Sequence, residues 1–306
     1  MDAPSVDVVI VNYRSYDELT RCLDSLDPAR PYLRHVTVVD HESDLAAAAR
    51  IADRFPWVYL VERATNEGFA TGVNLGARLT GSPFLLLLNP DCVADAHAIT
   101  ELLRFADSRP DAAVIGPRIL NADGSVQGSA RRFPGLTTAI AGRSSWLTRQ
   151  FPGNPLSRHN LPALDRRRTP LDVDWVSGAC MLVRRTAFEE VGGLDEEFFL
   201  YWEDADFCRR LSRCGWRTVY FPGAQIVHAG GRSSIHAFRE SLEAFHASAF
   251  VLFRKHATPR GRLCSPLVHL VLQIRLRVLL FLHRNRLRAS TPERATPAEA
   301  KGVARG

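Results

Sequence analysis

The chain has 306 residues, of which 46% are hydrophobic and 24% are charged. This composition excludes a wholly disordered protein and suffices for one large α/β domain or two smaller ones. Residues 232–306 hold 14 Lys and Arg against 4 Asp and Glu, whereas residues 1–231 hold 25 against 29. A near-neutral body with a basic tail argues against a nucleic-acid partner and favours a membrane-facing end.

The six cysteines form no CxxC pair and no framework spacing, and no signal-peptide pattern precedes Val6. Disulfide-bonded and zinc-binding domains show such spacings, so neither class is indicated. We therefore expect a protein of the reducing cytosol.

Strand and helix patterns alternate through the first half of the chain. Apolar, β-branched runs predict strands at 6–13, 35–43, 57–62, 82–92 and 112–120, with helical spacing in between. This alternation predicts a Rossmann-like α/β fold, with a mostly parallel sheet covered by helices on both faces. Ligands bind such sheets beyond the carboxyl ends of the strands, and Asn12, Asp40 and Asn89 follow strands at that edge.

After Gly128 the pattern becomes irregular and rich in Pro and Arg up to residue 170, which is typical of a functional loop region. Strand character returns at 174–185 and again at 216–222. Residues 226–234 then form a polar, glycine-containing segment that we expect to be a turn.

From residue 236 the pattern is helical and basic. Leucines and valines fill 267–282, but His269, Arg275 and Arg277 interrupt them, which argues against a membrane-spanning helix. His269, Gln273, Arg277, Arg284 and Arg288 project to one face. Such a helix lies in a membrane interface or packs on the body of the protein. We predict three parts: a catalytic domain over 1–235, a basic amphipathic membrane-proximal segment over 236–289 and a disordered tail over 290–306.

The sequence lacks the usual glycine-rich phosphate loops, since no GxGxxG follows the first strand and no GxxxxGK[ST] occurs. Asp91 instead places a carboxylate at the edge of the sheet where ligands bind. The competing explanation is structural, because Asn-Pro-Asp is also a common turn sequence. His228 follows a later strand. Together, one carboxylate and one imidazole suit Mg²⁺ or Mn²⁺ brought in on a diphosphate.

The segment 192–216 groups six carboxylates around Phe198, Phe199, Tyr201 and Trp202, which neither a solvated face nor a core explains alone. Its helical part begins near Glu203 and Asp204, so capping and dipole stabilisation are competing explanations. Capping uses one acid at most. The other acids, beside Tyr201 and Trp202, point to a catalytic or binding role.

Seven motifs in order resemble those of family-2 nucleotide-sugar glycosyltransferases with the GT-A fold, in particular a rhamnosyltransferase-like branch. They are VNYRS, VDHES, NEGFATGVNLG, NPDC, DWVSGACMLVRR, GGLDEEFFLYWEDADFCRRL and the histidine of VHAGGRSS. The resemblance spans about Val6 to Ser234, and seven ordered motifs are far more specific than any single one.

The resemblance implies the role of each site residue. Asp204 is the expected catalytic base with Glu203 beside it, and Asp91 and His228 are the expected metal ligands. The positions expected to hold the nucleotide sugar are Val11, Asn12, Asp40, Asn66, Gly68, Asn74 and Asn89. Asn89 replaces the first Asp of the family's Asp-x-Asp motif, and Asp40 is expected to bind the base. The expected acceptor-binding residues are Tyr201, Trp202 and Trp175.

The predicted function is transfer of a sugar, with L-rhamnose as the suggested case, from a nucleoside-diphosphate sugar to a lipid-linked or cell-wall saccharide. A single base implies inversion at the anomeric carbon, and a divalent Mg²⁺ or Mn²⁺ neutralises the leaving group. We expect the protein in the cytoplasm, bound peripherally to the inner face of the cell membrane. Two alternatives stay open: a nucleotidyltransferase acting on a sugar phosphate, and an inactive membrane-bound scaffold.

Overall fold

The computed structural model describes residues 6–135, 150–151, 154–161, 169–229 and 238–290. The chain divides into two compact units, Met1–Leu252 and Phe253–Gly306. The predicted domain boundary after residue 235 lies outside the described residues, as does the predicted tail over 290–306 apart from Ser290, which ends a helix. The three-part division therefore stays a prediction.

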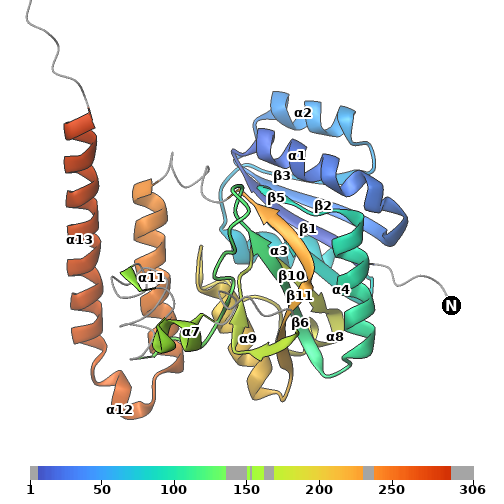
Figure 1. Cartoon of the computed structure of the whole chain (residues 1–306). Helices are drawn as coiled ribbons and strands as arrows, with labels where there is room; N and C mark the ends of the chain where they lie inside the picture. The colour runs from blue at the N-terminus through green and yellow to red at the C-terminus, as the bar shows by residue number, and fades with distance from the viewer. Residues whose placement is uncertain (1–5, 136–149, 152–153, 162–168, 230–237, 291–306) are drawn as a thin grey trace, which may run out of the picture. The chain divides into compact units, whose positions relative to one another are not determined.

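A curled central sheet organises the first unit (Figure 1). Its strands are β1 (Val6–Tyr13), β2 (Leu33–His41), β3 (Val58–Arg63), β4 (Phe84–Leu88), β5 (Cys92–Val93), β6 (Ala112–Leu120), β8 (Leu171–Val173), β10 (Cys180–Arg184) and β11 (Arg217–His228). They lie in the order β3-β2-β1-β4-β10-β6-β11-β5, with β8 also on β11. β1, β2, β3 and β4 are parallel, as are β6 and β11, whereas β10 runs antiparallel between β4 and β6. A second, two-stranded sheet pairs β7 (Ala130–Arg131) with β9 (Trp175–Val176).

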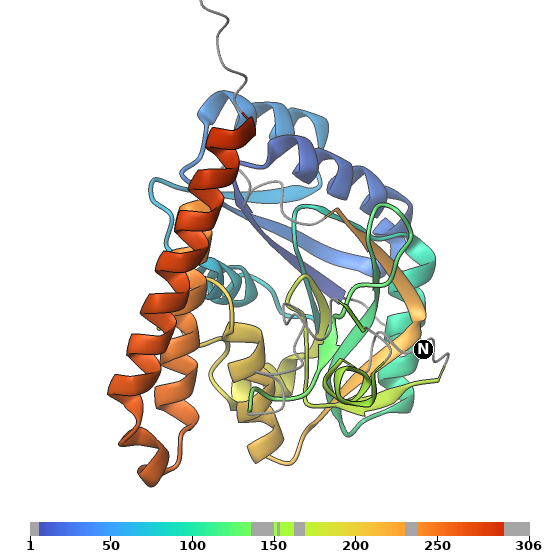
Figure 2. The ribbon, with the colours of Figure 1, turned by 60° about the vertical axis from the view of Figure 1, so that its left-hand side comes forward.

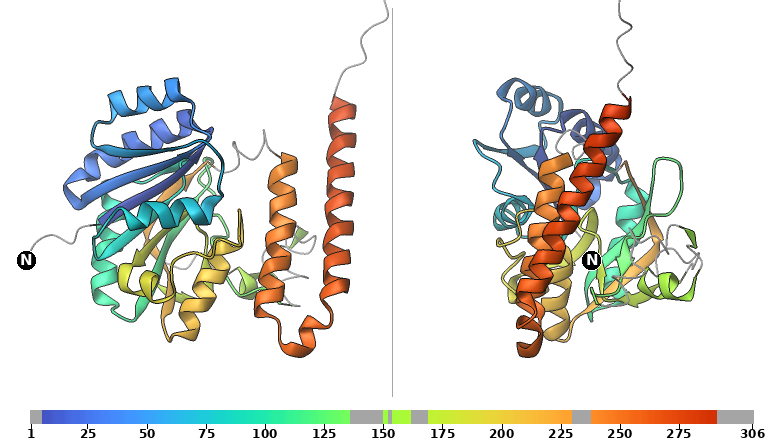
Figure 3. Two further views of the ribbon diagram at one scale, coloured as in Figure 1. Left: turned by 180° about the vertical axis from the view of Figure 1, so that it is seen from behind. Right: turned by 90° about the vertical axis from the view of Figure 1, so that its left-hand side faces the viewer.

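Helices cover both faces of the sheet, as the sequence predicted (Figures 1, 2 and 3). One face carries α1 (Tyr16–Leu26), α2 (Leu45–Arg54) and α4 (Ala96–Ser108). The other carries α3 (Phe69–Arg78), α8 (Arg185–Glu190) and α9 (Glu203–Arg213). The described residues also include a 3₁₀ helix (Asp27–Tyr32) and the short α7 (Pro155–Asn160). The predicted α/β class with a mostly parallel sheet is confirmed.

The residues of β1 explain why the sheet needs two helical layers. Val8 and Ile10 belong to the core cluster under α1, α2 and α4, while Val9 and Val11 belong to the cluster under α3, α8 and α9. A strand buried on both faces reads as a continuous apolar run, which VDVVIV nearly is. Close approach of α3 depends on Gly76, because a Cβ there would lie 2.5 Å from a methyl carbon of Val9.

One strand is longer than predicted. The sequence suggested a strand at 216–222 followed by a polar turn, but β11 continues to His228, with a register irregularity between Phe221 and Gln225. Pro222 and Gly223 interrupt the pairing without ending the strand, as a β-bulge does. His228 therefore stands in a strand, opposite Cys92 of β5.

The C-terminal part is helical, in agreement with the sequence pattern. α11 (Phe238–His256) crosses the division between the units, and its Leu252 joins the core cluster under α9. α12 (Pro259–Arg262) and α13 (Ser265–Ser290) belong to the second unit. Residues Ser265–Asn285, with a mean hydropathy of 1.6, are long and apolar enough to cross a membrane by length and composition.

Candidate active site

Two predicted donor-binding residues meet at the carboxyl ends of β1 and β2. Asn12 pairs with Asp40 in the parallel register, and its Nδ2 donates to Asp40 Oδ1 at 2.7 Å. Asp40 also accepts from Tyr16 Oη (2.8 Å) and Ser43 Oγ (2.6 Å), and both Asn12 and Asp40 are fully buried. Asn12 Oδ1 has no partner among the described residues, so a buried acceptor is available to a ligand here.

The turn after β4 is held by backbone hydrogen bonds on both sides. Asn89 N–H donates to Ala179 O (2.9 Å), and Ala229 N–H donates to Asp91 O (3.0 Å). β5 begins directly after Asp91 and pairs antiparallel with the end of β11. The Asp91 carboxylate is thus fixed at the ligand edge, where the sequence placed it.

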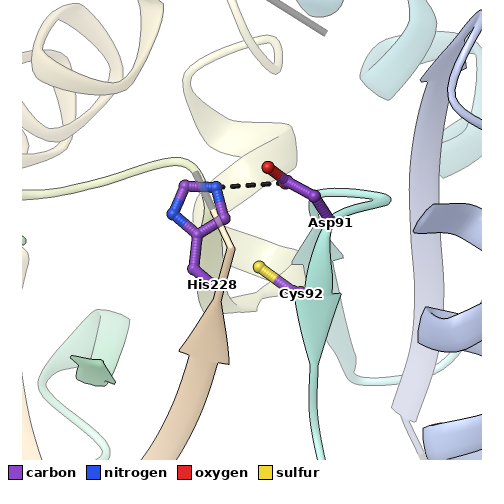
Figure 4. A group of neighbouring side chains, drawn as sticks. All are labelled: Asp91, Cys92 and His228. Atoms are coloured by element: carbon purple, nitrogen blue, oxygen red, sulfur yellow. Dashed lines mark ion pairs between the residues drawn. The ribbon is translucent and has the colours of Figure 1, made fainter. Parts of the chain in front are cut away.

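Asp91 and His228 come together, as predicted from positions 137 residues apart in the chain. His228 Nε2 lies 3.0 Å from Asp91 Oδ1, and both side chains are largely buried. Figure 4 shows the imidazole and the carboxylate facing each other across the ends of β11 and β5. Cys92 is the third neighbour, with all three potential ligand atoms within 4.8 Å of one another.

Cys92 is a poor ligand despite this proximity. Its Sγ–H donates to Ala179 O at 3.2 Å, and the side chain is completely buried. Burial raises the pKa of the thiol well above its usual range, with the nearby thiols and Asp91 acting in the same direction. Only a thiolate binds a divalent ion strongly, so Cys92 stays a hydrogen-bonded thiol.

The remaining pair fits a hard divalent ion. Neighbouring ligands of an octahedral ion, each about 2.1 Å from it, lie about 3 Å apart, which matches the 3.0 Å between His228 Nε2 and Asp91 Oδ1. One carboxylate and one imidazole suit Mn²⁺ or Mg²⁺ and leave most of the coordination shell to ligand oxygens.

Several acids of the segment 192–216 have structural roles. Asp206 is fully buried and accepts from Arg210 Nε at 2.7 Å, while Asp195 Oδ1 accepts from Glu197 N–H. Glu196 accepts from Asn74 Nδ2 at 2.9 Å. The surplus of acids inferred from the sequence is therefore smaller than expected and centres on Glu203 and Asp204.

Asp204 does not cap α9 in the usual way. Its Oδ2 accepts from Gly178 N–H at 3.0 Å, and its Oδ1 accepts from the adjacent Ala205 N–H at 2.8 Å. The cap position is taken by Trp202, which adopts a left-handed φ of 70°, directly after Tyr201 at 69°. Two consecutive large residues in this region are costly, and such strain clusters at functional sites.

The two carboxyls at the start of α9 differ in their environments. Burial raises the pKa of Glu203 well above its usual range, and the charge of Asp204 adds to this. Burial also raises the pKa of Asp204, but Gly178 N–H, the positive charge of Arg131 and Ala205 N–H oppose it. Glu203 Oε2 has no partner among the described residues, so the pair holds its proton on Glu203 and its charge on Asp204.

The Asp91 turn and Asp204 are tied to consecutive residues. Gly178 N–H donates to Asp204, and the next residue, Ala179, accepts from Asn89 N–H. Tyr201 lies near this turn as well: burial raises the pKa of its hydroxyl, a hydrogen bond with Ser241 lowers it, and the charge of Asp91 raises it. Asp204 and the turn that holds Asp91 are therefore bonded to adjacent residues of one backbone segment.

The loop before α3 contacts the acidic segment. Asn66 Oδ1 accepts from Gly68 N–H (3.0 Å), and Phe69 N–H donates to Phe199 O (2.8 Å). Gly68 has a φ of 90°, and a Cβ there would lie 2.6 Å from Phe199 O, so glycine is required.

Two predicted donor-binding residues of this region are mainly occupied by the fold. Asn74 is buried, donates to Leu194 O and accepts from Leu194 N–H, which joins α3 to the acidic segment. Val11 is 9% exposed and packs against Gly72. Their contact with a donor stays a prediction.

The predicted acceptor-binding aromatics form one row. Trp202 lies between Trp175 and Phe245, with ring centroids 6.1 Å and 5.2 Å away, and Tyr201 meets the same Phe245 at 5.8 Å. Trp175 is only 4% exposed and donates from Nε1 to Arg132 O, so it is the buried end of the row. Trp202 Nε1 is buried and has no partner within the described chain, which leaves a hydrogen-bond donor at the row's centre.

Comparison with known proteins decides the family. The family model described as "Glycosyltransferase like family 2" matches residues 3–245. The chain belongs to glycosyltransferase family 2. It is 35% identical over 256 residues to the N-acetylglucosaminyl-diphospho-decaprenol L-rhamnosyltransferase of Mycobacterium tuberculosis, covering 80% of this chain and 82% of that protein.

Solved structures show the same fold. The mannosyltransferase PcManGT from Pyrobaculum calidifontis, in complex with GDP-Man and Mn²⁺, superposes with a TM-score of 0.54 at 17% identity, over 96% of this chain and 77% of that one. GalNAc-T7 with UDP, GalNAc and Mn²⁺ gives 0.57 at 17% identity, over 73% and 43%. The GT-A expectation is confirmed, and this family 2 protein is a nucleotide-sugar glycosyltransferase.

Two residues to which the sequence assigned no role contact the candidate glycosyltransferase site. Arg131 stacks on Trp175, with its guanidinium carbon 4.6 Å from the ring centroid, and its charge acts on Asp204. Gln127 bonds to His228. The Asn-Ala-Asp-Gly-Ser stretch before Gln127 is a readable hairpin signal. For Arg131 no signal exists, because its place depends on the pairing of β7 with β9.

Proposed function

We propose that this enzyme is an inverting glycosyltransferase that moves L-rhamnose from dTDP-L-rhamnose to a hydroxyl of a lipid-linked saccharide. Asp204 acts as the general base towards the acceptor hydroxyl. Asp91 and His228 hold a divalent ion at the donor diphosphate. Glu203 lies beside Asp204 and stays protonated, so it does not compete with Asp204 for the proton of the acceptor hydroxyl.

The observation that carries the proposal is the link through Gly178 and Ala179. One residue donates to Asp204 and the next accepts from the Asp91 turn, at the carboxyl edge of the sheet where ligands bind. This link supports a site in which the base for the acceptor lies close to the residues that would hold the diphosphate. When bound, the ion supplies Lewis-acid neutralisation of the leaving diphosphate. Asp204, partly exposed and ionised, accepts the proton of the attacking hydroxyl.

The choice of sugar and acceptor is supported by the mycobacterial relative, whose name states an L-rhamnosyl transfer to an N-acetylglucosaminyl-diphospho-decaprenol. A sugar acceptor suits the aromatic row, since flat rings stack on the apolar faces of pyranoses. Trp202 Nε1 supplies a hydrogen-bond donor to such an acceptor.

A donor screen tests the proposal. Thermal unfolding is followed with dTDP-, UDP- and GDP-sugars in the presence of Mn²⁺ or Mg²⁺. We expect dTDP-L-rhamnose to raise Tm most, because a ligand at about 100 times its Kd stabilises the native state by about 2.7 kcal/mol. A larger rise in Tm with a UDP- or GDP-sugar would show that this sugar nucleotide, rather than dTDP-L-rhamnose, is the donor. No rise in Tm with any nucleotide sugar would refute the proposed donor site.

Because the proposed acceptor is linked to a lipid, the enzyme works at a membrane surface. In this proposal α13 is the helix that contacts the membrane. Its exposed apolar side chains recur at helical spacing along one stripe: Leu267, Leu270, Val271, Ile274, Val278, Phe281 and Leu282. Arg277 and Arg284 flank this stripe and are exposed. An apolar stripe edged by arginines fits an interfacial helix on anionic lipid, at the inner face of the cell membrane.

Vesicle sedimentation tests the membrane contact. The protein is expected to sediment with vesicles containing anionic lipid and to be released from them by Ile274→Glu, which puts a charge into the stripe. Leu45→Glu, at another exposed apolar position, is the matched control. Equal binding of the Ile274 variant and the unaltered protein would exclude the stripe as the contact.

A further inference from the structure

A hairpin turn lies beside the proposed ion site. Asn121 N–H donates to Ser125 O (2.8 Å), and Gln127 N–H donates to Ile119 O (2.8 Å). Gly124, at a φ of 79°, completes the turn. This geometry brings the half-buried Gln127 side chain to the end of β11, where its Nε2 donates to His228 O at 3.0 Å.

The side chains of this turn form a hydrogen-bond chain with only one possible direction. Asp123 is a carboxylate and accepts only, so the Ser125 hydroxyl donates to it at 2.6 Å. Ser125 has no second hydroxyl proton, so Asn121 Nδ2 donates to Ser125 Oγ at 2.7 Å. Asn121 Oδ1 then faces Gln127 and accepts from its Nε2 at 2.7 Å.

Two hydrogen bonds therefore fix the orientation of the Gln127 amide. Asn121 Oδ1 and His228 O are both acceptors, so the group that faces them is the Gln127 amino group. Gln127 Oε1 consequently faces His228 Nδ1 at 3.1 Å, and Nδ1 must carry the proton of that hydrogen bond.

A proton on Nδ1 determines what His228 presents to Asp91. In the neutral ring, Nε2 then carries a lone pair, directed at a carboxylate oxygen 3.0 Å away. Two such atoms attract each other only through a shared proton or cation. Metal-bound histidines in general donate their second ring N–H to an oxygen acceptor, which fixes the tautomer and the ring orientation.

We infer that Gln127 is a positioning residue, which holds His228 in the Nδ1–H tautomer so that Nε2 and Asp91 together bind the divalent ion. The inference rests on the proposed function for the ion site, but it assigns a role to a hairpin that the catalytic proposal does not use. Gln127 acts through His228 and touches neither donor nor acceptor in this role.

The first test needs no substitution in the tested protein and no metal. The protein is labelled with ¹⁵N-histidine, and the ring signals of His228 are identified by their loss in His228→Asn. At about pH 8, where an ordinary imidazole is neutral, we expect Nδ1 to carry a proton. A bare Nδ1, with the proton on Nε2 alone, would overturn the inference.

The second test measures affinity for Mn²⁺ alone, from the free-ion signal in electron paramagnetic resonance. Gln127→Met keeps the side-chain length but cannot accept from His228, and is expected to bind about 10- to 100-fold more weakly. Gln225→Met makes the same change at an exposed position of β11 and is expected to bind normally.

The outcomes separate the two proposals. If Asp91→Ala abolishes Mn²⁺ binding but Gln127→Met binds as tightly as the unaltered protein, the ion site stands and the role of Gln127 is refuted. If the unaltered protein does not bind Mn²⁺ at this pair, the ion site of the proposed function fails. The tautomer of His228 then still decides whether Gln127 orients it.

Discussion

The Asp204→Asn variant is expected to lose about 100- to 10,000-fold in turnover while keeping its affinity for the nucleotide sugar. Asparagine has nearly the same shape, and its carboxamide oxygen can still accept from Gly178 N–H, the contact at 3.0 Å that fixes this side chain. What disappears is the negative charge that takes the proton of the acceptor hydroxyl. Donor binding survives because it depends on the Asp91 edge of the site.

The measurement is turnover under saturating donor and acceptor, with donor affinity determined separately by titration. Glu197→Gln is the matched control, because it removes one exposed carboxylate from the same acidic segment. Near-normal turnover of Asp204→Asn would show that another group is the base. An equal loss in Glu197→Gln would point to the charge of the segment as a whole.

The same carboxylate determines the acid side of the pH profile. Burial raises the pKa of Asp204 above the ordinary 3.8, so the base takes up a proton at a higher pH than an exposed aspartate does. Because the protonated form cannot act as a base, kcat/KM falls as the pH drops through this raised value. The positive charge of Arg131 opposes this rise, while the charge of Asp204 in turn raises the pKa of the neighbouring Glu203.

The Asp91→Ala variant is expected to need about 10- to 100-fold more Mn²⁺ for half-maximal activity. It removes one of the two side chains that face each other at 3.0 Å, leaving His228 and the donor's own oxygens to hold the ion. At high Mn²⁺ much of the activity should return, since the diphosphate brings its own ligands.

Activity is titrated with Mn²⁺ at fixed donor concentration in both proteins. Asp53→Ala, which removes an exposed carboxylate on α2, should leave the titration unchanged. If the curve of Asp91→Ala superposes on that of the unaltered protein, Asp91 does not belong to the ion site.

The positions of Asp91, His228 and Asp204 were predictable because each sits in a motif tied to a local element. Asp91 follows an apolar strand, Asp204 begins an amphipathic helix and His228 follows the last strand pattern. A parallel sheet brings strand ends to one edge, so the sequence was enough to group Asp91 with His228.

Other roles depend on contacts between distant parts of the chain, which local patterns do not encode. Asn74 looks like a ligand group at a helix start, yet it bonds to Leu194, 120 residues away. The resemblance implies that Trp175 binds the acceptor, but the pairing of β7 with β9 and the stacked Arg131 bury it. Pro222 suggested a strand end, whereas the bulge after Phe221 lets β11 continue to His228.

The most direct measurement is a crystal structure of the protein with dTDP and Mn²⁺, with anomalous data collected at the manganese absorption edge. The proposed mechanism predicts a manganese peak bound to both Asp91 and His228, and the nucleotide's terminal phosphate on the side that Asp204 faces. A manganese peak elsewhere on the nucleotide, or an Asp204 carboxylate turned away from that phosphate, would contradict it.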